Sequence, residues 1–125
     1  RHAGFTSGTP WLPVNENYRT LNAAAEEKDT DSVLHFYRHL AKLRETIPAL
    51  LDGVYEELLE ENEQIYAFSR TLGKTCIKTA VNFSTKDAAL PAGFLRGTRL
   101  AGSYADAPTT ALRPLEAVIY EEEIQ

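Results

Sequence analysis

The sequence predicts a mainly β protein with one principal helix, and three observations on its 125 residues support this class. Beyond residue 53, short β-branched and apolar runs alternate with turn residues at intervals of about ten residues, which is typical of an antiparallel β-sandwich. Residues 31–46 carry apolar side chains at the spacing of one helix face. Residues 1–31 are polar and rich in turn-forming residues, so they contain little that could form a core.

Composition argues against several function classes. Apolar residues make up 43% and charged residues 25%, as in an ordinary globular domain, and a chain of this length can bury a real core. The formal net charge is −5, and no basic run is available to neutralise nucleic-acid phosphates or an anionic membrane surface. No apolar stretch reaches the roughly 18 residues of a membrane-spanning helix. We therefore expect neither a nucleic-acid partner nor a membrane partner.

The first 31 residues are expected to form a long loop that is anchored on something larger. A structureless segment of this length is rare inside a small domain unless it is functional. Its bulky side chains, Phe5, Trp11 and Tyr18, are separated by glycine, proline and asparagine. Because the chain begins at Arg1 rather than at a methionine, we expect its start to be a cut within a longer protein.

A helix is predicted from about Asp31 to Thr46. The polar residues 29–32 offer N-caps and negative charge at its positive end. Pro48 disfavours helical backbone at Ile47 and is expected to end the segment. The helix presents one wide apolar stripe, which implies packing against a larger body: Val33, Phe36, Tyr37, Leu40, Leu43 and Ile47.

The strands are predicted from the runs that follow. Gly73-Lys74 suits the turn of a hairpin that joins Ile65–Leu72 to Cys76–Phe83. The segment Tyr55–Glu63 is ambiguous, because its glutamates and leucines favour a helix while its flanks favour strands. Three further runs complete the set: residues 88–92, 98–102 and 115–120.

The opening residues 3–18, AGFTSGTPWLPVNENY, carry a resemblance. They resemble a stretch near the end of the catalytic barrel in the α-amylase superfamily (glycoside hydrolase family 13), closest to the oligo-1,6-glucosidase, dextran glucosidase and trehalulose or trehalose synthase group. Further segments are similar to that group in the same order: residues 31–34, 36–38, 43–44, 48–50, 53–55, 66–70, 82–84 and 112–117.

The resemblance implies an architecture. Residues 1–50 would be the terminal loop and last helix of a (β/α)8 catalytic barrel, and residues 51–125 a C-terminal antiparallel β-sandwich domain. It also resolves the ambiguous segment, with Val54–Leu59 as a strand and Glu60–Gln64 as the following turn.

The resemblance implies an activity for a longer parent enzyme. Such a parent would be an α-glucosidase that hydrolyses α-linked gluco-oligosaccharides with retention, through two carboxyl groups about 5 Å apart. In the family those carboxylates precede the segment that resembles this chain, so the fragment is expected to be structural and catalytically inactive. Its expected partners are the oligosaccharide of the parent enzyme, the missing catalytic barrel, and further copies of itself that cover its apolar stripe. The resemblance also implies a bacterial cytoplasmic location.

Trp11 is the one candidate for a substrate contact. Barrel enzymes build their sites from loops at the carboxyl ends of the strands, and sugar rings pack on aromatic faces. The alternative role, which we favour, is that Trp11, Phe5 and Tyr18 anchor the loop on the barrel wall. We expect no catalytic residue in the chain.

Other polar groups favour structural interpretations. His35 and His39 have zinc-ligand spacing, but they share a face with Arg38 and Lys42 and lack a third ligand. We therefore expect no metal, and nothing in the sequence indicates a cofactor. Cys76, the only cysteine, is expected to be a small buried apolar group. The acidic residues 56–63 and 121–123 are expected to be a solvated turn and a soluble tail, and Asn82-Phe83-Ser84, which matches a glycosylation sequence, to be the end of a strand.

The sequence leaves one alternative function open, which is a carbohydrate-binding or protein-interaction β-sandwich module. A carbohydrate-binding module needs a row of exposed aromatic side chains on one sheet face. The aromatic residues are spread over several predicted strands, an arrangement that suits a core better.

Overall fold

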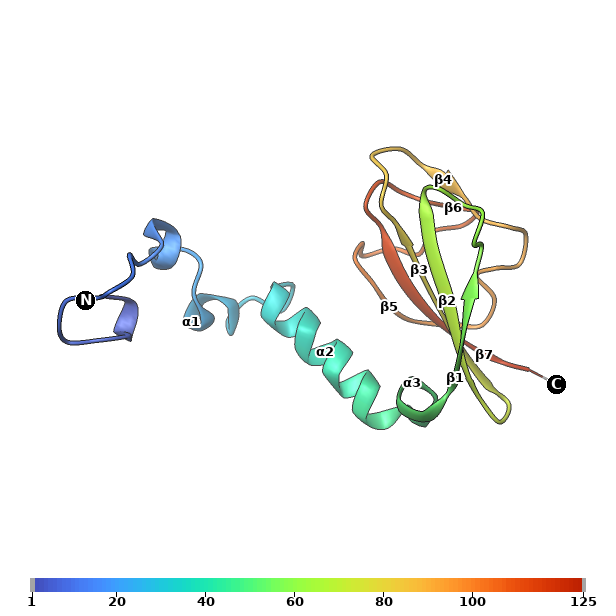
Figure 1. Cartoon of the computed structure of the whole chain (residues 1–125), viewed down its shortest axis with the longest axis horizontal. Helices are drawn as coiled ribbons and strands as arrows, with labels where there is room; N and C mark the ends of the chain where they lie inside the picture. Colours follow the sequence, from blue (N-terminus) through green and yellow to red (C-terminus); the bar gives the residue numbers. More distant parts are fainter. Residues whose placement is uncertain (1, 125) are drawn as a thin grey trace. The chain divides into compact units, whose positions relative to one another are not determined.

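The computed structural model describes residues 2–124 and shows a chain built mostly of antiparallel strands, with few helices (Figure 1). The predicted mainly β class is therefore confirmed. The chain divides into two compact units, residues 1–41 and 42–125. Among the described residues, no helix combines the length and the apolar character that a membrane span requires.

The first unit contains short helical turns where the sequence predicts a long loop. They are η1 (His2–Gly4), η2 (Glu16–Arg19) and α1 (Ala23–Glu26). Asparagine caps account for two of them. The Asn15 side chain accepts a hydrogen bond from the backbone N–H of Asn17 at the start of η2, and Asn22 Oδ1 accepts one from the Ala25 N–H at 2.9 Å at the start of α1.

The principal helix, α2 (Val33–Thr46), confirms the helix predicted over residues 31–46. Two side chains supply its cap, because Ser32 Oγ accepts from the His35 N–H and the Glu26 carboxylate accepts from the Leu34 N–H at 3.0 Å. None of its residues is buried, and its stripe includes Val33 and Tyr37, which are 66% and 68% exposed.

Pro48 ends α2 as expected, and a second helix begins directly after this break. Ile47 is extended, with φ −108° and ψ 102°, as the residue before a proline prefers. Pro48 then opens a second helix, α3 (Pro48–Asp52), because its fixed φ and missing N–H suit the first helical position.

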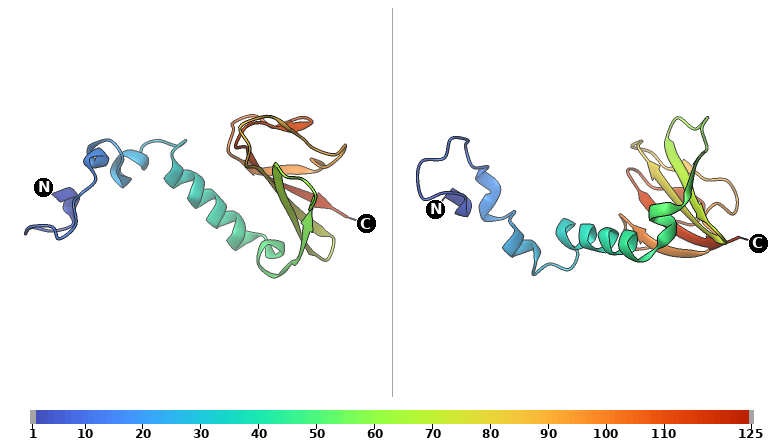
Figure 2. Two further views of the ribbon diagram at one scale, coloured as in Figure 1. Left: turned by 45° about the horizontal axis from the view of Figure 1, so that its top comes forward. Right: turned by 60° about the horizontal axis from the view of Figure 1, so that its bottom comes forward.

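Five strands form one antiparallel sheet in the order β1-β2-β3-β7-β5. A separate two-stranded antiparallel sheet pairs β4 with β6. Residues 54–123, which contain all the strands, lie together in both views of Figure 2. The strands are β1 (Val54–Leu58), β2 (Ile65–Leu72), β3 (Thr75–Asn82), β4 (Ala88–Ala89), β5 (Thr98–Gly102), β6 (Ala111–Leu112) and β7 (Ala117–Glu123).

Several predicted strands are confirmed. The hairpin of β2 and β3 turns at Gly73, whose φ is 59°, and β5 has the bounds that the sequence predicts. The ambiguous segment is a strand: β1 pairs with β2 from Val54 opposite Thr71 to Leu58 opposite Ala67. This backbone pairing outweighs the helix propensity of the glutamates and leucines.

Two expectations need correction, and one strand was not predicted. The acidic residues 121–123 are not a free tail, because they belong to β7 and pair with residues 75–77 of β3. Glu122 also forms an ion pair with Lys78, and both side chains are about four-fifths buried. The strand expected over residues 88–92 is only two residues long, and its partner β6, which is equally short, was not predicted.

The two faces of the five-stranded sheet have different coverings, because successive side chains point to opposite faces. The inner face carries the core, where residues of β2, β3 and β7 pack with Ala88 and Leu112 of the β4–β6 sheet. The outer face carries Tyr66, Phe68 and Arg70 of β2 together with the residues paired to them on β1 and β3. The buried core cluster consists of Ile65, Ala67, Ala80, Ala88, Leu112, Val118 and Tyr120.

Candidate functional site

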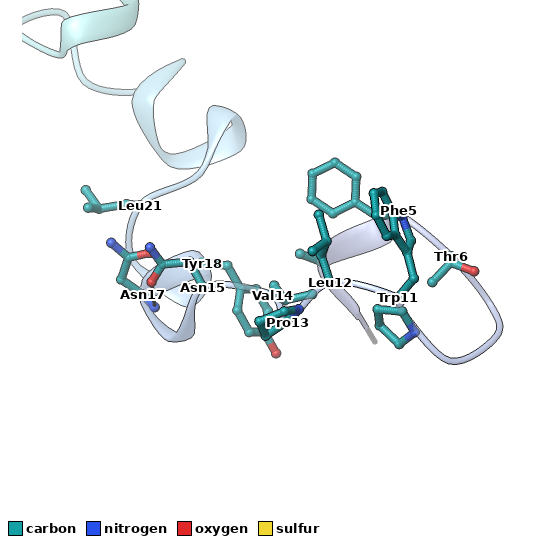
Figure 3. A pocket seen from close by; sticks show the side chains of 12 residues that line it. Phe5, Thr6, Trp11, Leu12, Pro13, Val14, Asn15, Asn17, Tyr18 and Leu21 are labelled. Carbon is teal, nitrogen blue, oxygen red and sulfur yellow. Dashed lines mark hydrogen bonds between the residues drawn. The ribbon is translucent and has the colours of Figure 1, made fainter.

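The candidate substrate-contact residue Trp11 lies in an open apolar hollow of the first unit, about 530 Å³ in volume. In Figure 3 the Phe5, Leu12 and Trp11 side chains lie at one end of the hollow, and those of Asn17 and Leu21 at the other. The lining residues are Ala3, Phe5, Thr6, Pro10, Trp11, Leu12, Pro13, Val14, Asn15, Asn17, Tyr18 and Leu21. The structure thus brings together the three aromatic residues that the sequence singles out.

Local hydrogen bonds and prolines shape this segment. Gly8 N–H donates to Thr6 Oγ1 at 3.1 Å, and Tyr18 N–H donates to the Asn15 carbonyl at 3.2 Å. Pro10 and Pro13 flank Trp11 and fix φ on both sides of it. Trp11 is 92% exposed and Phe5 86% exposed. Within the first unit, therefore, neither ring is held by burial, and both present an open apolar surface.

The chemistry of this hollow is binding chemistry. Aromatic rings and proline edges can pack against the apolar face of a sugar, and the Asn17 side chain can exchange hydrogen bonds with hydroxyls. The described lining contains no carboxyl group. It therefore offers neither the nucleophile nor the acid that retaining glycoside hydrolysis requires.

The histidine pair on α2 has its own local contacts. The Nε2 atom of His35 lies 3.2 Å from the carbonyl oxygen of Glu27, and Arg38 donates two hydrogen bonds to the Glu27 carboxylate. These bonds from Arg38 hold the pKa of Glu27 below its ordinary value. Among residues 2–124, no group of three or more histidine, cysteine or acidic side chains is arranged to hold a metal ion.

The acidic residues of the first hairpin do not form a catalytic pair. Glu56 and Glu57 are neighbours on β1, so their side chains point to opposite faces of the sheet. Both are exposed. Cys76 is buried on β3, as expected for a small apolar group.

Asn82 is a buried residue with a structural role rather than an accessible acceptor for glycosylation. Its side chain is fully buried at the end of β3. Its amide donates to the carbonyls of Lys86 and Arg113 at 2.7 and 2.9 Å and to that of Leu112 at 3.2 Å, while its oxygen accepts from the Ser84 N–H at 2.9 Å. The interpretation of this motif as the end of a strand is therefore confirmed.

A buried ion pair near the end of the chain was not predicted from the sequence. Glu116 is fully buried and accepts hydrogen bonds from the Arg113 guanidinium at 2.7 and 3.0 Å and from the Arg113 N–H at 2.8 Å. Arg113 also reaches Asp106 at 2.8 Å and lies 4.0 Å above the Tyr104 ring. The only sequence signal was a glutamate between two apolar residues, inside the run predicted over residues 115–120.

The structure also gathers aromatic side chains on the outer face of the sheet. The ring centroid of Phe68 lies 5.5 Å from that of Tyr55 and 5.8 Å from that of Tyr66, with tilts of 32° and 45°. The two tyrosine hydroxyls are 2.9 Å apart. This hydrogen bond, with burial and nearby negative charge, raises the pKa of Tyr55 to about 12. The sequence did not predict this cluster, because it depends on the pairing of β1 with β2.

Comparison with known proteins places this geometry in a family. Residues 1–53 match the family model described as Alpha amylase, catalytic domain. The chain is 44% identical over 85 residues to the oligo-1,6-glucosidase of Parageobacillus thermoglucosidasius, a match that covers 68% of the chain and 15% of the relative. It is 36% identical over 120 residues to the oligo-1,6-glucosidase of Heyndrickxia coagulans, covering 95% of the chain and 22% of the relative. The α-glucosidase of Pediococcus pentosaceus is 35% identical over 123 residues, with coverage of 96% and 22%.

Solved structures also match the chain over almost its whole length. A trehalulose synthase mutant in complex with Tris superposes with a TM-score of 0.85 at 36% identity, covering 98% of the chain and 24% of that protein. The trehalose-6-phosphate hydrolase of Bacillus licheniformis gives a TM-score of 0.83 at 30% identity, with coverage of 96% and 23%. The chain thus spans less than a quarter of the length of each of these proteins.

Proposed function

Because the chain belongs to the α-amylase superfamily, we propose that it is the C-terminal part of an α-glucosidase that acts on α-linked gluco-oligosaccharides. In this proposal residues 1–50 are the terminal loop and last helix of the catalytic barrel, and residues 51–125 are a C-terminal β-sandwich. The parent enzyme hydrolyses its substrate with retention, in the bacterial cytoplasm.

One observation carries the proposal. The match to the catalytic-domain model runs to residue 53, directly after α3, and β1 begins at Val54. The relatives named oligo-1,6-glucosidase and α-glucosidase nevertheless align with about 95% of the chain, across this boundary. A segment that crosses from the end of a catalytic domain into a following sheet domain fits both facts.

The chain by itself is proposed to be inactive. Retaining hydrolysis needs two carboxyl groups about 5 Å apart on either side of the scissile bond. The hollow that contains Trp11 has no carboxyl group in its described lining. The catalytic pair of the parent enzyme is therefore proposed to lie outside these residues, and the chain contributes structure.

For Trp11 we propose an anchoring role on the barrel wall, with sugar contact as the alternative. An almost fully exposed tryptophan between two prolines is a large apolar surface held in a restricted backbone, which suits burial against a neighbouring body. Replacing Trp11 with alanine in a full-length enzyme separates the two roles. Anchoring predicts a lower melting temperature with an unchanged KM, and sugar contact predicts a raised KM with unchanged stability.

The test of the proposal uses p-nitrophenyl α-glucoside and isomaltose. The purified chain should hydrolyse neither substrate. The second part of the test uses the Heyndrickxia coagulans oligo-1,6-glucosidase without its 120 aligned residues. Co-production with the chain should restore the stability or the activity of this truncated enzyme. Turnover by the chain alone would refute the proposal that the catalytic carboxyl groups lie outside these residues.

A carbohydrate-binding module is the second candidate function, and the exposed Tyr55 and Tyr66 on the outer face favour it. The rings around Phe68 are tilted by 32° and 45°, however, so they form no flat platform for a sugar ring. Retention of the chain on an α-glucan affinity gel would support this second function, and elution in the void would count against it.

A further inference from the structure

We infer that the free edge of β1 is a pairing surface for a second copy of this chain, and that Glu56 and Glu57 keep the two copies apart. The occupant of this edge is the β1 strand of the second copy, which pairs with the first strand about a two-fold axis. The inference goes beyond the proposed function and does not depend on it.

β1 lies at one end of the five-stranded sheet (Figure 1). The strand order begins with β1, and among the described residues its only ladder partner is β2. An edge strand presents unpaired backbone N–H and C=O groups, which act as a template for pairing with another chain. Val54 is 74% exposed and Tyr55 is 47% exposed. The edge of β1 thus offers backbone hydrogen bonds next to apolar side chains that reach solvent.

The two edges of the sheet differ in regularity. At the β5 edge, the pairing with β7 shifts register between Arg99 and Ala101. A bulge of this kind bends a strand and interrupts the ladder, which discourages further pairing. At the other edge, β1 pairs with β2 in unbroken register from Val54 to Leu58. A regular edge needs another form of protection, and the side chains of β1 supply charge.

Glu56 and Glu57 place one negative charge on each face of the β1 edge. They are consecutive in the strand, so their side chains point to opposite faces of the sheet. Both are exposed, and within residues 2–124 neither takes part in an ion pair. A strand that approaches this edge therefore meets an uncompensated charge on either face.

The length of β1 determines which side chains meet in such a pair. Full overlap of two antiparallel copies puts Val54 opposite Leu58, and Tyr55 opposite Glu57. Glu56 then lies opposite Glu56 of the second copy, with the two Cβ atoms about 5 Å apart. The backbone and the apolar pair favour association, whereas the two facing carboxylates oppose it. Removing or reversing the charge at this position should therefore release the pairing.

The first experiment removes the charges. All chains carry Tyr37→Lys, so that the apolar stripe of α2 contributes less to association. Glu56→Gln combined with Glu57→Gln should lower the dimer dissociation constant at least about tenfold, because the facing like charges are gone. The matched control is Glu60→Gln combined with Glu61→Gln, which changes the net charge equally at exposed residues after the end of β1. Sedimentation velocity over a concentration series measures both constants, and the control should leave the constant unchanged.

Salt provides an independent test of the repulsion. In about 1 M sodium chloride the Debye length is about 3 Å, shorter than the separation of the facing side chains. The chain that keeps Glu56 and Glu57 should then associate more tightly than at low salt. The chain with both glutamines should respond less, because it has no charge at these two positions to screen.

The second experiment tests the register by charge reversal. Glu56→Lys alone keeps like charges opposite each other in a symmetric pair. An equimolar mixture of this variant with the chain that keeps Glu56 places lysine opposite glutamate. The mixture should therefore associate at least about tenfold more tightly than either component alone. Amide hydrogen exchange should slow at residues 54–58 in the associated form, because backbone groups at the edge become paired.

Three outcomes would overturn the inference. They are an association of the glutamine variant no tighter than that of its control, a mixture that associates no more tightly than its components, and exchange protection that leaves out residues 54–58. Melting temperatures check that the variants are folded, and the substitutions at exposed glutamates should change them little. None of these outcomes bears on the proposed function, which is tested by substrate turnover and by co-production.

Discussion

A single buried amide, Asn82, holds together three stretches of the second unit. Its hydrogen bonds reach residue 84, residue 86 and residues 112–113. We expect Asn82→Ala to lower the free energy of unfolding by about 3 kcal/mol, because several buried backbone groups lose their partner at once. Urea unfolding followed by circular dichroism measures the loss. Lys86→Ala, which removes only an exposed side chain, should change stability by less than about 0.5 kcal/mol.

The buried carboxylate of Glu116 makes stability depend on pH. Burial alone would raise its pKa, but the hydrogen bonds from the Arg113 side chain and backbone and the positive charges of Arg113 and Arg99 hold the pKa below its ordinary value. A carboxyl group whose pKa is lowered by folding stabilises the folded state above its unfolded pKa. That contribution is lost as the pH falls below about 4.3 and through the folded-state pKa.

The pH dependence is testable with a neutral analogue. Glu116→Gln should be less stable than the unaltered chain by about 2 kcal/mol at pH 7, with a smaller difference in acid, because glutamine keeps the shape but not the charge. Unfolding midpoints measured between pH 3 and pH 7 give the comparison. Asp106→Asn is the control: Asp106 is exposed, so its change should have little effect, and a larger effect than that of Glu116→Gln would contradict the argument.

Among the elements, the edge strand β5 depends on one glycine. Gly97 precedes β5 with φ +93°, and a Cβ atom there would lie 2.0 Å from the Glu121 carbonyl oxygen of β7. We expect Gly97→Ala to cost about 3 kcal/mol or more, because strain in the backbone and a clash with a neighbouring strand act together.

A second glycine supplies the control for this prediction. Gly73, in the β2–β3 turn, also has positive φ, at +59°, but has no atom within 4 Å of its Cβ position. Gly73→Ala should therefore lower the free energy of unfolding by only about 1 kcal/mol, which is the cost of a positive φ without a clash. Thermal unfolding of the two variants measures the difference. Equal losses would show that the close approach of β7 is not important.

At the scale of the whole molecule, the chain exposes more apolar surface than a self-sufficient domain of its size is expected to. No residue of α2 is buried, and Trp11 and Phe5 are almost fully exposed. Large exposed apolar patches mark interaction surfaces. This pattern is what the proposal of a missing catalytic barrel predicts for these elements.

The isolated chain should therefore bind an apolar dye or self-associate. Tyr37→Lys, on the exposed stripe of α2, should reduce dye fluorescence or the sedimentation coefficient, whereas Arg44→Lys, on the same helix, should change neither. Sedimentation velocity across a range of concentrations, combined with dye titration, provides the measurement. A monomer without dye binding would count against the proposal that these surfaces evolved to be covered.

The elements whose signal is local could be predicted from the amino-acid sequence alone. The stripe of residues 31–46 indicated α2, and the turn at Gly73 indicated the β2–β3 hairpin, because side-chain periodicity and turn chemistry depend on neighbours along the chain. The opening motif of residues 3–18 was also sufficient to indicate the α-amylase superfamily. The strand expected over residues 54–59, which the structure has at 54–58, followed from that resemblance, since its local propensity was ambiguous.

Features that depend on residues far apart in the sequence were decided only by the tertiary structure. It turned the expected acidic tail into part of β7, joined the two-residue strands β4 and β6, buried Glu116 against Arg113 and assembled the aromatic cluster on the outer face. Each of these features comes from strand pairing or from the packing of one sheet on another. A two-residue strand or a buried charge is stable only with its distant partner in place, so neither leaves a pattern in the local sequence.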